Sequence, residues 1–223
     1  MSDIAYLHAI SYYHYAQVYN SNKEKYLALL HEAINYLSIF ASEWGDLRSA
    51  YEADDYCGLC HYEAENYSQA KNFFYTASYI SLGIIDTIQD ETERALELEA
   101  MKQVIQRARA HYAMAANACN EYQLAIQSVD ELYAIFPQET QCYEMQLALI
   151  EKGYACYKLN DLSGVDIIKK IAQEGNPAAR EARERISRIL QLNDRKNPIN
   201  ANFCNAVHND YSFFTFSPIS YHI

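Results

Sequence analysis

The chain has 223 residues, half of them apolar, and a formal net charge of −11. This composition supports one substantial core, or a solenoid that grows by stacking short units. Its acidic balance argues against nucleic acid as a partner, because phosphate backbones repel negative charge. No run of about 18 apolar residues and no basic, apolar leader is visible, so we expect a cytoplasmic protein that does not enter the membrane.

Helical spacing runs through most of the chain. Apolar residues recur at intervals of three and four, as Leu27, Leu30, Ala33 and Ile34 do, and this spacing is typical of one helix face. Asn and Asp mark the breaks, where their side chains can cap helix ends. We expect helices at residues 3–19, 23–43, 46–64, 67–82, 90–119, 121–136, 139–159, 162–174 and 177–192.

Three segments share the same internal intervals. Each has a small residue, then an aromatic residue or leucine, then a small or apolar residue three positions later. The sets are Gly58, Tyr67 and Ala70; Ala113, Tyr122 and Ala125; and Gly153, Leu162 and Val165. The pattern resembles the tetratricopeptide repeat, which joins two helices by a short turn. The small residues would let two helices cross closely, and the residues after the turns would fill the space between helices.

The resemblance covers residues 6–177 approximately and implies hairpins that must stack, because one hairpin cannot bury its own apolar face. The repeats are spaced more widely than the family period of about 34 residues, so irregular, long helices are expected. The predicted fold is all-α: a tetratricopeptide-like α-α superhelix of four hairpins plus a capping helix over residues 1–193, with an aromatic C-terminal tail over residues 194–223. An irregular helical bundle is the alternative.

In tetratricopeptide proteins the first helix of each repeat lines a concave groove that holds another protein. The resemblance places ten side chains in such a groove: Tyr15, Tyr19, Glu52, Asp55, Tyr62, Arg107, Asn117, Tyr154, Tyr157 and Lys158. Tyrosine offers a large contact area, a hydroxyl and few torsions to freeze, although several of these tyrosines could pack between repeats. We expect a non-enzymatic adaptor, chaperone or assembly factor that binds a peptide or helix, with a peptide-sensing regulator as the alternative.

One segment matches a cofactor motif. Cys57-Gly58-Leu59-Cys60-His61 reads as the C-x-x-C-H of covalent haem attachment, and its thiols could bind zinc if His111 and Cys119 approached. The packing role of Gly58 argues against haem, and a second pair of ligands is not near in sequence. We expect two thiols buried in the core, no cofactor and no catalytic residue, and we keep a metal or haem protein as a further alternative.

The chain changes character after Lys196. Residues 198–223 hold one charged side chain, Asp210, and many aromatic ones, including those of 211–216. Disordered tails usually have few aromatics and many charges, and exposed aromatics promote aggregation. We therefore expect the tail to fold back onto the last helices or into the groove. The alternatives are contact with a neighbouring molecule, which would make a homodimer, and a poorly ordered tail.

Overall fold

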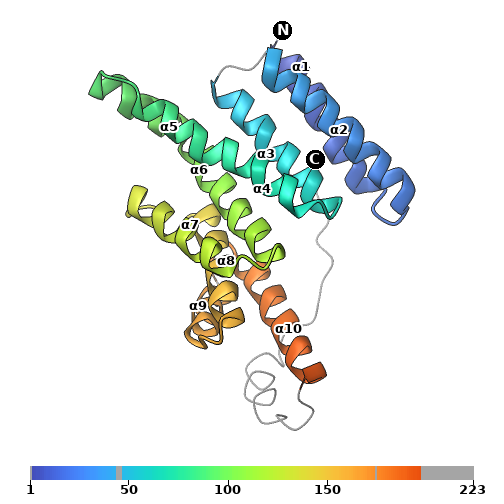
Figure 1. The fold of residues 1–223 in the computed structure, drawn as a ribbon, viewed down its shortest axis with the longest axis vertical. Coiled ribbons are helices and arrows are strands. Elements are labelled where there is room, and N and C mark those ends of the chain that lie inside the picture. Colours follow the sequence, from blue (N-terminus) through green and yellow to red (C-terminus); the bar gives the residue numbers. More distant parts are fainter. Residues whose placement is uncertain (1, 44–46, 174, 197–223) are drawn as a thin grey trace.

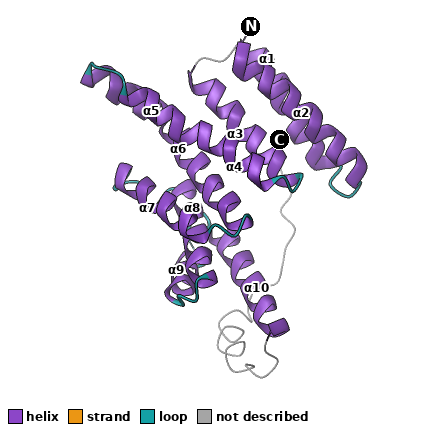
Figure 2. Cartoon of the chain, viewed as in Figure 1, coloured by secondary structure: helices purple, strands orange, loops and turns teal. Residues whose placement is uncertain are grey.

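The computed structural model describes residues 2–43, 47–173 and 175–196, and within these residues all regular structure is helical (Figures 1 and 2). The expected all-α class is therefore confirmed for this part of the chain, whereas most of the aromatic tail lies outside it. The elements are α1 (Ser2–Val18), α2 (Lys23–Glu43), α3 (Leu47–Glu63), α4 (Tyr67–Tyr75), a π-helical turn η1 (Thr76–Ile80), α5 (Ser81–Asp86), α6 (Glu91–Ala118), α7 (Tyr122–Ile135), α8 (Tyr143–Lys158), α9 (Ser163–Ile171) and α10 (Ala179–Lys196).

The helix expected at 67–82 is longer and less regular than its sequence pattern indicates. It runs through α4, η1 and α5 to Asp86. The hydroxyls of Ser78 and Ser81 donate to the carbonyls of Phe74 and Ala77, both at 2.7 Å, around the widened turn. Such back-bonding to the preceding turn is common where a helix departs from α geometry. Together with the first turns of α6, α5 reaches away from the other helices (Figure 1).

The helices stack in chain order. Each of the pairs α1–α2, α3–α4, α6–α7 and α8–α9 packs internally, and each second helix also contacts the first helix of the next pair. Successive first helices touch as well: α1 with α3, α3 with α6, α6 with α8, and α8 with α10. Buried apolar side chains form a series of clusters between these pairs. No described helix is long and apolar enough to cross a membrane.

Three of the hairpins share one turn. Glu65, Asn120 and Asn160 each adopt a positive φ, of 63°, 62° and 67°, and each follows the small residue of its sequence repeat by seven positions. In every case the backbone amide of the following residue donates to the carbonyl of the residue five positions before that amide, at 2.8 to 2.9 Å. A left-handed residue with this hydrogen bond is the Schellman ending of a helix. The three segments that share sequence intervals therefore also share a turn.

Two glycines mark a close contact between α8 and α9. A Cβ added to Gly164 would lie 2.1 Å from the carbonyl oxygen of Gly153, and one added to Gly153 would lie 2.6 Å from that of Gly164. The backbones of α8 and α9 therefore touch at this point. A Cβ on Gly58 would meet the ring of Phe74 at 2.4 Å, so this glycine admits an aromatic side chain from α4. Close helix contact is the packing role expected from the sequence.

Candidate interaction surface

Two of the predicted residues, Tyr15 in α1 and Tyr19 just after its end, lie together and apart from the others. The hydroxyls of Tyr15 and Tyr19 are 2.9 Å apart, and the Lys25 ammonium at the start of α2 lies 3.5 Å from the Tyr19 ring centroid. Toward α3, α1 presents Gln17, which donates to Glu63 at 2.7 Å. Residues two positions apart point to nearly opposite sides of a helix. The spacing of the tetratricopeptide repeat therefore identified tyrosines that lie on a different side of α1 from the side that contacts α3.

Glu52, Asp55 and Arg107 do meet, but as a buried link between α3 and α6. Arg107 donates to Asp55 at 2.6 Å and to Glu52 at 3.2 Å, and His111 Nδ1 lies 2.8 Å from the other oxygen of Asp55. Burial alone would raise the pKa of Asp55, but the charges of His111 and Arg107 outweigh it and lower the pKa. Asp55 is fully buried, so the expectation that it contacts a partner is wrong.

A second polar cluster joins four helices. The Asn117 amide of α6 donates to the backbone and side-chain oxygens of Glu151 in α8, both at 2.9 Å. Glu151 also pairs with Arg185 of α10, whose guanidinium lies 4.5 Å from the Tyr154 ring centroid. Burial raises the pKa of Tyr62 in α3, and the charges of Glu151 and Arg185 are near enough to act on it. These five residues are called the central cluster.

The members of the central cluster differ in exposure. Asn117 and Glu151 are buried, so Asn117 serves as a link between helices and not as a partner contact. Tyr62, Tyr154 and Arg185 are half-buried and reach the surface. Tyr157, also predicted for the groove, packs against the apolar core between α8 and α10. Three predicted residues thus come together in this cluster, and they are Tyr62, Asn117 and Tyr154.

Positive charge borders the central cluster. The Lys158 ammonium lies 5.6 Å from the Tyr122 ring centroid and 5.9 Å from that of Tyr154, distances at which a cation is attracted to an aromatic face. Arg188 is exposed, and its charge acts to lower the pKa of Tyr62. Within the described residues, no ion pair joins Lys158 or Arg188 to a carboxylate. This surface therefore presents available cations on an otherwise acidic chain.

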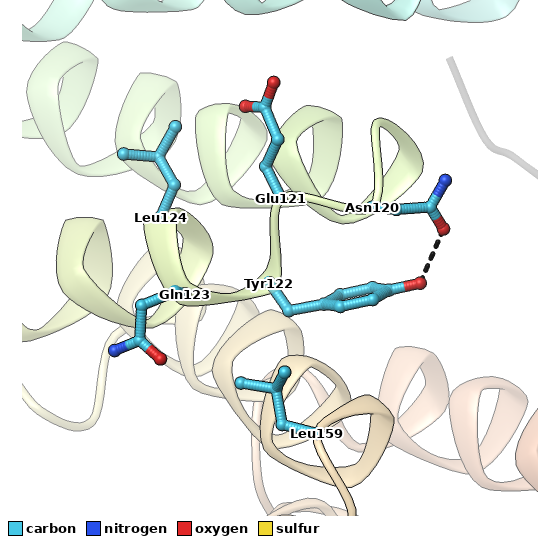
Figure 3. Close-up of a pocket in the computed structure, with 6 residues that line it drawn as sticks. All are labelled: Asn120, Glu121, Tyr122, Gln123, Leu124 and Leu159. Carbon is cyan, nitrogen blue, oxygen red and sulfur yellow. Dashed lines mark hydrogen bonds between the residues drawn. The ribbon is translucent and has the colours of Figure 1, made fainter.

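An open hollow of about 380 Å³ adjoins this surface, and it is called the turn-edge hollow. Residues 120–124 of the α6–α7 turn and Leu159 of the α8–α9 turn line it (Figure 3). The Tyr122 hydroxyl donates to Asn120 at 2.6 Å, which fixes the ring along one wall (Figure 3). Lys158 approaches both this ring and that of Tyr154, so it lies between the hollow and the central cluster. The sequence did not indicate this hollow.

The C-x-x-C-H segment is part of the core. Cys57 and Cys60 are fully buried, and burial raises the pKa of the Cys57 thiol to about 12, which disfavours the thiolate that a metal requires. His61 stacks on Phe73 with ring centroids 5.2 Å apart. Phe74 occupies the space beside Gly58, which leaves no room for a haem there. No group of three potential metal-ligating side chains occurs among the described residues.

Comparisons of the chain with protein-family models, with curated proteins and with solved structures found no match.

Proposed function

We propose that this chain is a tetratricopeptide-like interaction protein that holds a peptide segment or helix of another protein, without catalysis, on the surface around the central cluster. The supporting observation is that Asn117 of α6, Glu151 of α8 and Arg185 of α10 join three successive first helices in one polar cluster, in which the Arg185 guanidinium lies 4.5 Å from the Tyr154 ring centroid. A curved stack brings its first helices toward a common centre, which is how solenoids form concave binding surfaces.

The chemistry of the surface limits the kind of partner. Tyr62 and Tyr154 offer ring area together with hydroxyls, and Lys158 and Arg188 offer positive charge without a carboxylate partner among the described residues. Aromatic residues and arginine are the side chains that most often dominate interface energies. The partner segment should therefore carry apolar side chains next to one or more carboxylates.

The experiment is an affinity capture with the intact chain, followed by binding measurements on each captured partner. Tyr154→Ala and Lys158→Glu should each weaken binding by about tenfold or more, because truncation of an interface anchor costs about 2 kcal/mol. Tyr75→Ala is the matched control, since Tyr75 is 43% exposed but lies on the second helix α4. Circular dichroism should show that all three variants are folded.

If folded Tyr154→Ala and Lys158→Glu bind every captured partner with wild-type affinity, the central cluster is not the binding surface. If Tyr75→Ala weakens binding as much as they do, the contact lies on the second helices.

A further inference from the structure

The last of the three equivalent turns is less covered than the others. Leu162, in α9's N-cap position, occupies the place that Tyr67 and Tyr122 hold in the earlier turns, and those tyrosines are half-buried. Leu162 is 62% exposed, and Leu159 of the same turn is 46% exposed. In the earlier turn, Lys158 of the following pair lies over Tyr122. No described residue gives the last turn a comparable cover.

One of the two exposed leucines, Leu159, belongs to the turn-edge hollow, and Leu162 lies three residues further along the same turn. Leu159 lines the hollow together with residues 120–124, which include Tyr122 and Leu124. Its ring and aliphatic walls suit an aromatic side chain, and aromatic rings placed against such walls bury a large area for few frozen torsions. This area is apolar and exposed, and an apolar segment bound there would remove both leucines from water.

α10 runs beside α8. The amide of Ala178 donates to Gln146 near the start of α8, at 3.3 Å, and Arg185 pairs with Glu151 further along both helices. The two helices therefore run in the same direction. Each residue adds about 1.5 Å to a helix, so α10 reaches the level of the α8–α9 turn before it ends at Lys196. The last described residue, Lys196, therefore lies beyond the level of that turn.

The segment that follows is chemically suited to the hollow. It comprises 27 residues, enough to extend about 90 Å, and Tyr211-Ser212-Phe213-Phe214-Thr215-Phe216 within it carries no charge. Other exposed apolar side chains, such as Ile4 and Leu7 on α1, lie at the opposite end of the stack from α10. We propose that residues 211–216 of the chain's own tail dock on the turn-edge hollow and cover Leu159 and Leu162. This inference holds whether or not the central cluster binds a partner.

The test compares amide hydrogen exchange in the full-length protein and in a form that ends at Pro198. Docking predicts that amides of residues 119–124 and 157–164 exchange about tenfold faster without the tail, because one well-covered leucine contributes about that factor to local stability. Leu162→Glu in the full-length chain should have the same effect. Leu96→Glu is the matched control, because Leu96 is 68% exposed on α6 but away from the hollow.

The proposal is overturned by unchanged exchange in both segments after truncation, by an equal effect of Leu96→Glu, or by tail-dependent protection elsewhere on the stack. If the truncated form does not fold, the full-length triple variant Phe213→Ser, Phe214→Ser and Phe216→Ser replaces it. Protection should also be unchanged on hundredfold dilution. Protection that disappears on dilution would assign the tail to a neighbouring molecule and refute docking within the chain.

Discussion

The contact between Gly153 and Gly164 makes a sharp prediction about Gly164→Ala. The added Cβ would lie 2.1 Å from the Gly153 carbonyl oxygen and 2.7 Å from the Cys156 Cβ, where ordinary contacts begin at 3.4 Å. The nearest of these atoms belongs to the backbone, so no side-chain rotation relieves it. To accommodate alanine, α8 and α9 must move apart by about 1 Å, and overpacking of this kind costs about 1–3 kcal/mol.

Helix propensity works in the opposite direction but is smaller. Alanine is favoured over glycine by about 1 kcal/mol within a helix, and less in a first turn, where Gly164 lies. We therefore expect Gly164→Ala to reduce the free energy of unfolding by about 1–2 kcal/mol, which corresponds to a fall in Tm of about 5 °C for a chain of this size. Thermal and urea unfolding followed by far-UV circular dichroism would measure both quantities.

Gly83→Ala provides the matched control. Gly83 lies in α5, and a Cβ placed on it meets no atom within 4 Å. Propensity alone should then raise stability by about 1 kcal/mol. If Gly83→Ala stabilises the protein and Gly164→Ala does so equally, the backbones of α8 and α9 are not in contact and the assigned packing of this hairpin is wrong.

Three further predictions concern the core. Ala125→Trp should lower Tm sharply, because Ala125 is fully buried between helices and overpacking costs about 1–3 kcal/mol or more; an unchanged Tm would contradict the repeat register. Arg107→Ala should cost about 3 kcal/mol in urea unfolding, since it leaves the buried Asp55 charge with only His111, and Asp55→Asn in the same chain should recover part of that loss. Burial raises the pKa of Asp54 to about 6. The protonated carboxyl therefore favours folding at low pH, and this contribution to stability is lost as the pH rises through 6. At pH 8, Asp54→Asn should unfold at a higher urea concentration than wild type, whereas at pH 4 it should not.

Helix positions were predictable because they depend on local information. Apolar spacing and polar breaks placed the hairpin turns at residues 65–66, 120–121 and 160–161, where the structure has its left-handed residues. The π-helical turn η1 was not predicted. It depends on how α4 and α5 pack against α3 and α6, and periodicity in the sequence does not record that packing.

The side chains of the surface were less predictable. Family spacing assigns a position on a repeat, but it does not reveal whether a polar side chain there meets another. Asp55 finds Arg107 and His111 more than fifty residues away, and Asn117 finds Glu151 thirty-four residues away. These pairings turn two expected groove residues into internal links. One signal was present in the sequence: aspartate, arginine and histidine on helix faces otherwise rich in alanine indicate buried pairing, because unpaired buried charge is costly.

The order of packing has a consequence for how the protein is made. All principal contacts of α1 and α2 are with each other and with α3, and contacts between elements close in the chain give low contact order and fast folding. During synthesis, this pair leaves the ribosome before the later pairs, with one apolar face uncovered. That face is buried only when α3 has formed, and each later pair then packs against helices that are already folded. The chain can therefore assemble progressively as it is translated, without waiting for its C-terminus.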